Sequence, residues 1–178
     1  MKLLMSGRGI AALVVSVVAV AVAAAGTASA RSDHAAAKTR IHSAVVKGSA
    51  GPVTRTFSFI GPPGSKTATI VSIDGLTINA RCGTAGQPVI FAFSGVAKSD
   101  ILGRIFDGLG RLHSIHNTSF SPNVSVSLST TSGDFDASGS VLFETPAGKV
   151  VTVSYGFDNA TTLGKQNLCT VFGSAIAS

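Results

Sequence analysis

Charged residues are scarce in this chain of 178 residues: they make up 12% of it, and Glu144 is the only glutamate. An average globular protein has about 25% charged residues, and disordered chains are more strongly charged still. Glutamate is also a favoured residue on helix surfaces. The low charge, together with 45% hydrophobic residues, excludes a disordered, charge-rich chain. The lack of glutamate argues against a helical bundle.

Valine, threonine, serine, glycine and phenylalanine dominate instead, which is the composition of β-strands joined by turns. The formal net charge is +6, but no block of basic residues occurs, so the pattern gives no support to nucleic-acid binding. We predict an all-β fold, an antiparallel β-sandwich or a small β-barrel of about seven to nine strands.

The one long apolar run lies at the N-terminus and has the features of a signal peptide. Basic residues flank its start, small apolar residues fill 10–25, and Ala28-Ser29-Ala30 has the small-x-small pattern that a signal peptidase recognises. The run is shorter than the roughly 20 residues that span a bilayer. We therefore predict a signal peptide over 1–30 with cleavage between Ala30 and Arg31. The mature chain is expected to lack an integral membrane segment and to be secreted or associated with the cell envelope.

The chain has two cysteines, Cys82 and Cys169. Neither has the CxxC spacing or the neighbouring histidine that a metal site or a reactive thiol would have. In an oxidising compartment such a pair most often forms one disulfide. We predict a bond between Cys82 and Cys169 that ties an early strand to the last strand.

Alternation of apolar and hydroxyl-bearing residues locates the strands. Residues 31–50 lack such periodicity and are predicted to form a flexible N-terminal tether, followed by a single β-domain over 51–178. Asp74-Gly75 and Pro146-Ala147-Gly148-Lys149 are turn signals that predict hairpins. The expected strands lie at 53–60, 66–73, 76–82, 89–94, 124–130, 138–145, 150–155 and 168–177.

The segment 101–116 is ambiguous. Ile101, Ile105 and Leu109 have helical spacing, but the three glycines within the segment would each cost a helix about 1 kcal/mol. The glycines favour two short strands around Asp107-Gly108, with a helix as the alternative.

Two segments partly resemble ligand-binding loops. Residues 61–67 (GPPGSKT) look like the end of a phosphate-binding loop, but Ser65 replaces the glycine that should precede the lysine, and a strand follows instead of a helix. Asp134, Asp136 and Ser138 copy the first half of a calcium loop, yet Thr145 stands where a bidentate glutamate should be. No cofactor is predicted from either segment, and a looser Ca²⁺ site around Asp134 is kept as a minor alternative.

Catalytic and metal-ligating patterns are weak. His113 and His116 would share one face of a helix but lie on opposite faces of a strand, so they predict no metal site. No GxSxG motif occurs, and the disulfide would leave no free thiol as a nucleophile. We nominate no catalytic residue, and an extracellular hydrolase with an unidentified site remains an alternative.

Several short segments together resemble a group of proteins. They are the run Ser72 to Cys82, His113-Ser114, Gly133-Asp134-Phe135-Asp136, Gly148 to Val153, and Cys169 followed by Gly173-Ser174-Ala175-Ile176. This combination resembles uncharacterised secreted β-rich proteins of high-GC Gram-positive bacteria, over most of residues 53–177. The resemblance implies an exported β-rich protein of bacterial origin, and it implies no activity or binding residues.

These observations predict a non-enzymatic, monomeric β-domain that acts by binding or as a structural element. Its partner would be an unknown ligand of the cell envelope or the extracellular space. The alternative is an extracellular carrier, in which phenylalanines line a cavity for an apolar ligand. The residues for such a cavity would be Phe57, Phe59, Phe91, Phe93 and Phe143.

Overall fold

The computed structural model describes residues 39–46, 51–130, 136–160 and 168–178. Within these ranges it contains eleven β-strands, and none of the described residues forms a helix that could span a membrane. The strands are β1 (Arg40–Val46), β2 (Val53–Gly61), β3 (Ala68–Ile73), β4 (Leu76–Cys82), β5 (Pro88–Ser94), β6 (Ser99–Asp107), β7 (Leu112–Phe120), β8 (Ser125–Ser127), β9 (Asp136–Glu144), β10 (Val150–Ala160) and β11 (Leu168–Ala177).

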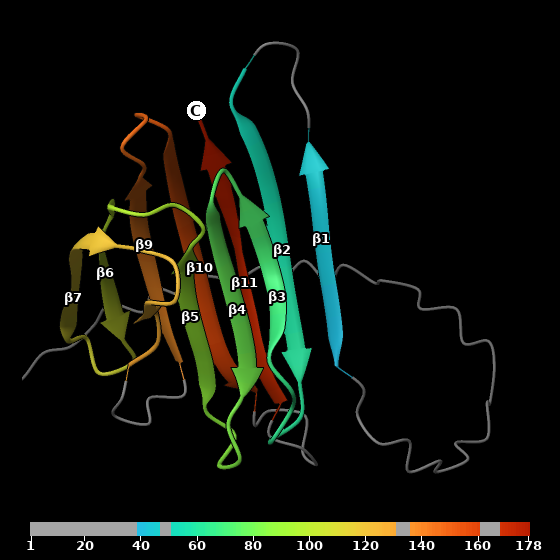
Figure 1. Cartoon of the computed structure of the whole chain (residues 1–178). Helices are drawn as coiled ribbons and strands as arrows, with labels where there is room; N and C mark the ends of the chain where they lie inside the picture. The colour runs from blue at the N-terminus through green and yellow to red at the C-terminus, as the bar shows by residue number, and fades with distance from the viewer. Residues whose placement is uncertain (1–38, 47–50, 131–135, 161–167) are drawn as a thin grey trace, which may run out of the picture. The chain divides into compact units, whose positions relative to one another are not determined.

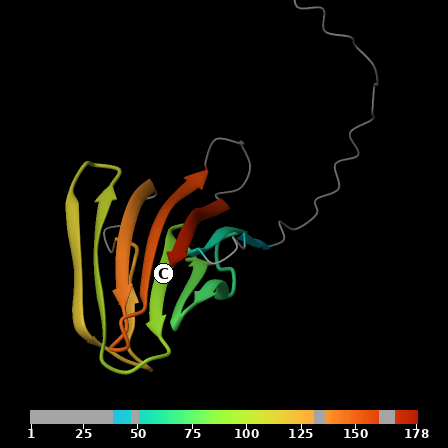
Figure 2. The same ribbon diagram turned by 90° about the horizontal axis from the view of Figure 1, so that it is seen from above.

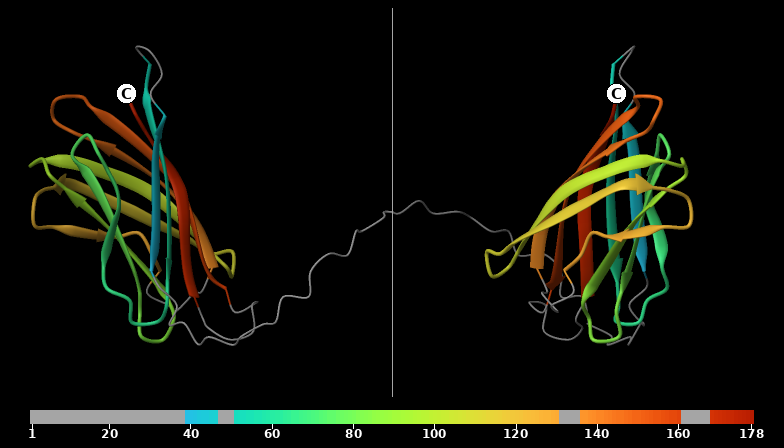
Figure 3. Two further views of the ribbon diagram at one scale, coloured as in Figure 1. Left: turned by 90° about the vertical axis from the view of Figure 1, so that its right-hand side faces the viewer. Right: turned by 60° about the vertical axis from the view of Figure 1, so that its left-hand side comes forward.

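The strands form two antiparallel sheets. The larger has seven strands in the order β1-β2-β11-β10-β9-β6-β7, and the smaller has four in the order β3-β4-β5-β8. Strands β3, β4 and β5 lie over β2, β11 and β10 (Figure 1), and the view from above separates the two layers (Figure 2). The strand directions of the larger sheet rotate progressively from β1 to β7 (Figure 3), which is the ordinary twist of a β-sheet. The predicted all-β fold is confirmed, and the open choice of architecture is resolved as a sandwich.

The core lies between the sheets and is built by the predicted alternation. On β2, Phe57 and Phe59 are buried while Ser58 is only half-buried on the opposite face. Phe120 and Phe143 meet edge to face with their ring centroids 6.1 Å apart, a favourable aromatic geometry.

The Tyr155 hydroxyl donates a hydrogen bond to the Leu128 carbonyl at 2.9 Å. Burial raises the pKa of Tyr155, so this hydroxyl remains a donor at physiological pH.

Both predicted hairpins are present. Asp74 and Gly75 have φ values of 43° and 89° between β3 and β4, which are the two positive φ values that a tight two-residue hairpin turn requires. Between β9 and β10, Gly148 has a φ of 76°, and its N–H donates to the Thr145 carbonyl at 2.9 Å. Aspartate and glycine at these places therefore fix the register of the paired strands.

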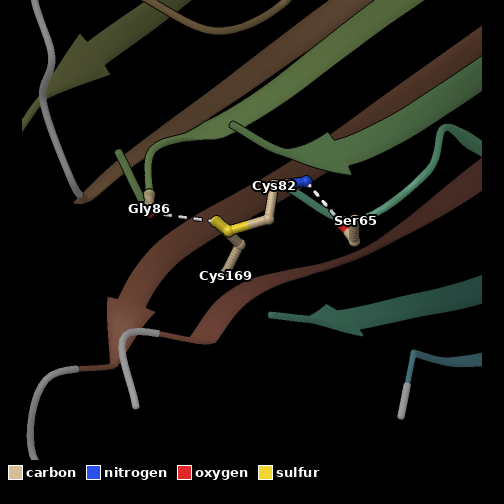
Figure 4. Close-up of a disulfide and its surroundings, with 4 residues drawn as sticks. All are labelled: Ser65, Cys82, Gly86 and Cys169. Carbon is tan, nitrogen blue, oxygen red and sulfur yellow. Dashed lines mark hydrogen bonds between the residues drawn. A yellow bond between two sulfur atoms is a disulfide. The ribbon is translucent and has the colours of Figure 1, made fainter. Parts of the chain in front are cut away.

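The predicted disulfide is confirmed. Cys82 at the end of β4 is bonded to Cys169 at the start of β11, with 5.5 Å between their Cα atoms, so the bond joins the two sheets (Figure 4). The Cys82 N–H donates to Ser65 Oγ at 2.9 Å. Cys169 Sγ lies 3.0 Å from the Gly86 carbonyl oxygen. Both cysteines are buried, which closes one end of the core.

Three expectations about strands need correction. The described residues form eleven strands rather than seven to nine. Part of the predicted tether, 40–46, is β1, and it pairs along its whole length with the edge of β2. This strand was missed because backbone pairing with β2, rather than an alternating sequence, holds it. The domain therefore includes residues before Gly51, and the strand expected at 124–130 is shortened to 125–127.

The ambiguous segment 101–116 is resolved as strand. It lies in β6 and β7, which pair around a turn at Asp107 to Arg111. The glycine argument was therefore sound, and the helical spacing of Ile101 and Ile105 has another explanation. Both residues point into the core from alternate positions of one strand.

Candidate functional site

The outer face of the seven-stranded sheet is the surface that points away from the smaller sheet. Cross-strand pairing aligns its side chains in rows that run across the strands. The central row consists of Ser114, Arg104, Ser140, Ser154, Ser174 and Thr56, taken from β7 to β2. Its members come from six strands, so neighbouring residues of the row are far apart in the sequence. With strands about 4.8 Å apart, this row is about 24 Å long.

Two rows that contain large apolar residues flank the central row on the outer face. One consists of Leu112, Phe106, Ser138, Gly156, Phe172 and Ser58, and the other of His116, Leu102, Leu142, Thr152, Ile176 and Thr54. Nine large hydrophobic residues are exposed among the described residues, and six of them lie in the flanking rows. They are Leu112, Phe106 and Phe172 on one side, and Leu102, Leu142 and Ile176 on the other. Leu112 pairs directly with Phe106, and Leu102 pairs with Leu142, while serine, glycine and threonine positions separate these pairs from Phe172 and Ile176. Exposed apolar side chains that gather on one face can mark an interaction surface.

Phe172 has a packing role as well as an exposed surface. A side chain at Gly156, directly opposite on β10, would meet the Phe172 ring at 2.8 Å. The ring therefore covers the glycine backbone, but it remains 54% exposed. Covering Gly156 accounts for one side of the ring and leaves the other side available for contact.

Arg104 carries the only charge in the central row. It is exposed on β6, opposite Ser114 on one side and Ser140 on the other. It forms no ion pair or hydrogen bond with any residue that the structure describes. The guanidinium is therefore free to bind an anionic group, for which its planar set of donors is well suited.

Three shallow grooves follow one another along the central row. The first, of about 560 Å³, lies around Arg104 and includes Leu102, Ser114 and Leu142. The second, of about 600 Å³, lies around Ser154 and Gly156. The third, of about 350 Å³, lies around Thr56 between β1 and β2. The hollowed part of the outer face thus extends across the sheet.

A second cluster of polar groups holds the turn between β6 and β7. The Asp107 side chain is inaccessible to solvent and accepts hydrogen bonds from Arg111 Nε at 2.6 Å and His113 Nε2 at 2.9 Å. It also accepts from the backbone N–H groups of Leu109 and Arg111. Burial raises the pKa of Asp107, but the hydrogen bonds from His113 and Arg111 outweigh it and lower the pKa well below its ordinary value. We interpret this cluster as a structural clamp on the hairpin.

This clamp predicts a loss of stability in acid. The pKa of Asp107 is lower in the folded state than in the unfolded state. The ionised carboxylate therefore contributes its full stabilisation of the fold above the unfolded pKa of about 4, and this stabilisation is lost as the pH falls toward the folded pKa. We expect the unfolding free energy of the wild type to fall more steeply below pH ~4 than that of Asp107→Asn. Urea unfolding at a series of pH values measures both slopes. Parallel slopes would contradict the assignment.

Among the residues that the structure describes, the histidines and acidic residues do not assemble into a metal site, and the Ca²⁺ alternative around Asp134 stays a prediction because Asp134 lies outside them. His113 faces Asp107, while His116 lies on the outer face opposite Leu102. Asp136 and Ser138 lie in β9, and Asp134 falls outside the described residues. Within the described ranges, no group of three histidine, cysteine or acidic residues could hold a metal ion.

The five phenylalanines of the carrier hypothesis do not line one cavity. Phe57, Phe59 and Phe143 are packed in the core, whereas Phe91 and Phe93 are only half-buried on β5, with positions alternating with the buried Ile90 and Ala92. The Arg81 guanidinium lies over the Phe91 ring, 6.0 Å from its centroid. Of residues 61–67, Gly61 ends β2 and 62–67 form the connection to β3, where Ser65 Oγ accepts a hydrogen bond from the Cys82 N–H. Ala30 and Arg31 lie outside the described residues.

Sequence reasoning missed the outer face, although a signal was present. Adjacent large apolar residues occur in several strands, as in Ile105-Phe106 and Val141-Leu142. Successive strand residues point to opposite faces, so one member of each pair must lie outside the core. Comparison with known proteins adds no family: no protein-family model, curated protein or solved structure matches the chain.

Proposed function

We propose that this protein is an exported, non-enzymatic binding domain, and that the outer face of its seven-stranded sheet contacts the ligand. The observation that supports it is the concentration, in two rows of that one face, of six of the nine large hydrophobic residues that are exposed in the described part of the chain. Leu102 and Leu142 are exposed on this face, and the contact with Gly156 accounts for only one side of the exposed Phe172 ring. Bound to a ligand, these side chains would gain roughly 25 cal/mol for each Å² removed from water.

Export agrees with the apolar run and the cleavage pattern at the N-terminus, and the disulfide agrees with an oxidising compartment. The ligand is therefore sought in the cell envelope or outside the cell. The domain would act there by contact through a rigid sheet rather than through mobile loops. Strands of a sandwich hold the side chains of such a face at fixed spacing.

The test is co-sedimentation with isolated cell envelopes of the producing host. The protein is taken from the exported fraction of that host, where its mass reports whether the chain begins at Arg31. We expect the wild type to sediment with the envelopes and the Leu102→Ala/Leu142→Ala variant to bind at least tenfold more weakly. The control is Phe93→Ala, which removes an aromatic ring from β5 of the other sheet.

Equal binding of the wild type and the outer-face variant would overturn the assignment of this face. So would an equal loss with Phe93→Ala, or a wild type that stays in the supernatant. Circular dichroism and urea unfolding of each variant show that reduced binding does not come from unfolding.

A further inference from the structure

We propose that the ligand is a linear glycan carrying carboxylate groups, bound across the strands along the central row. This inference rests on the proposed function, since it names the ligand of the same face. It follows from three features of that face: a guanidinium with no partner among the described residues, flanking rows that contain large apolar side chains, and grooves that succeed one another in a line.

The anionic character of the ligand follows from Arg104. Arg104 lines the first groove together with Leu102 and Leu142, and Ser114 and Ser140 lie opposite it on the neighbouring strands. Guanidinium binds carboxylate with two parallel hydrogen bonds, and such pairs are stronger than hydrogen bonds between neutral groups. The serine hydroxyls can donate to and accept from the sugar hydroxyls beside the carboxylate.

The surrounding charges are compatible with an anionic ligand on this row. Acidic residues of the outer face occur in opposed pairs, Asp100 with Glu144 and Asp136 with Asp158. Each of these four acidic residues lies four positions along its strand from the residue of the central row on the same strand, which is about 13 Å. That distance exceeds the Debye length of about 8 Å at physiological ionic strength. The positive charge of Arg104 therefore dominates at the centre of the face.

The linear form of the ligand follows from the line of grooves. They extend from Ser114 on β7 to Thr56 on β2, about 24 Å, which is longer than a single small molecule. The flanking rows lie two residues to each side, so they are about 13 Å apart. An extended glycan offers hydroxyl groups at its edges and C–H surfaces on its rings, which match the central row and the apolar side chains of the flanking rows respectively.

Two other occupants fit less well. An extended peptide is usually recognised by adding to an open strand edge. The outermost described strands of this sheet are β1 and β7, whereas β2, β11, β10, β9 and β6, which carry all of the central row except Ser114, are paired on both sides. If a second copy stacked with its central row on this one, Arg104 would face serine and threonine hydroxyl groups or a second Arg104, and burial of an ion without an opposite charge is costly. A glycan with carboxylates satisfies the guanidinium and leaves the backbone pairing intact.

The test measures binding of the exported protein to carboxylated glycans by titration calorimetry. The probes are polygalacturonate, alginate and hyaluronate, with methyl-esterified polygalacturonate as the neutral counterpart of the first. We expect binding of a carboxylated probe that weakens at least tenfold in Arg104→Gln, is partly retained in Arg104→Lys, and declines as salt is added. Arg81→Gln is the matched control, because Arg81 is an exposed arginine on β4 in the other sheet.

The outcomes separate this inference from the proposed function. If the wild type sediments with envelopes but binds none of the three carboxylated glycans, the glycan inference is wrong and the binding face stands. Equal affinity for the methyl ester, tighter binding of a poly-glutamate peptide, or an equal loss in Arg81→Gln would also overturn it. A concentration-dependent dimer that disappears in Leu102→Ala/Leu142→Ala would identify a second copy as the occupant instead. Failure of both envelope and glycan binding would overturn both proposals.

Discussion

Replacing Cys82 and Cys169 together by alanine is expected to lower the free energy of unfolding by about 4 to 5 kcal/mol. The bond closes a loop with a sequence separation of 87, and its main effect is to restrict the unfolded chain. In the chain-entropy model, a loop of this length corresponds to that range. Small domains are stable by about 5 to 15 kcal/mol in total, so the variant would lie close to the limit of folding.

Urea unfolding of the oxidised wild type and the double variant measures this difference. Ser65→Ala is the control, because it removes the hydrogen bond to the Cys82 N–H and keeps the covalent link. We expect it to cost about 1 kcal/mol. If the double variant does not fold, urea unfolding of the wild type is measured with and without reductant instead. The shift in the urea midpoint between the two conditions then reports the effect of the disulfide. A double variant within 1 kcal/mol of the wild type would contradict the expectation.

The position of the bond adds to its effect. Cys82 ends β4 in the smaller sheet, and Cys169 begins β11 in the larger sheet. Between them the chain forms β5 to β10, which supply strands to both sheets. The bond therefore fixes the two layers to each other at one end of the core, where the Gly86 carbonyl also approaches Cys169.

The sequence is sufficient to predict most strands because they carry a clear period of two. Phe57 and Phe59 on β2 alternate with hydroxyl-bearing residues, and Asp74-Gly75 specifies the turn that follows β3. β1 has no such alternation and is held by backbone pairing with β2. Local patterns therefore identify strands with one buried face, and they miss a strand that a neighbour holds in place.

The outer face could not be predicted in the same way, because it depends on which strands are neighbours. Arg104, Ser140 and Ser174 lie on β6, β9 and β11, and only the sheet order and register align them. The sequence indicates that Phe106 or Leu142 must point out of the core, since each follows an inward-pointing residue. It does not indicate that they lie on one face around a common row.

Removal of a core phenylalanine ring is expected to cost much more stability than removal of a phenylalanine ring of the outer face. Phe143 on β9 is fully buried and packs against Phe120, so Phe143→Ala should lower the unfolding free energy by about 3 to 5 kcal/mol through lost burial and the cavity left behind. Phe172 on β11 is 54% exposed, so Phe172→Ala should cost about 1 kcal/mol. Its contact with Gly156 accounts for that smaller loss.

The same pair of variants separates stability from binding. Urea unfolding of each gives the two free energies, and co-sedimentation with host envelopes gives the binding. We expect Phe172→Ala to remain folded and to bind less envelope than the wild type, because its ring forms part of a flanking row beside Ser174 and Ser154. A cost for Phe172→Ala as large as that for Phe143→Ala would assign the ring to the structural core. Unchanged binding by a stable Phe172→Ala would remove this end of the face from the contact surface and restrict the site to the groove around Arg104.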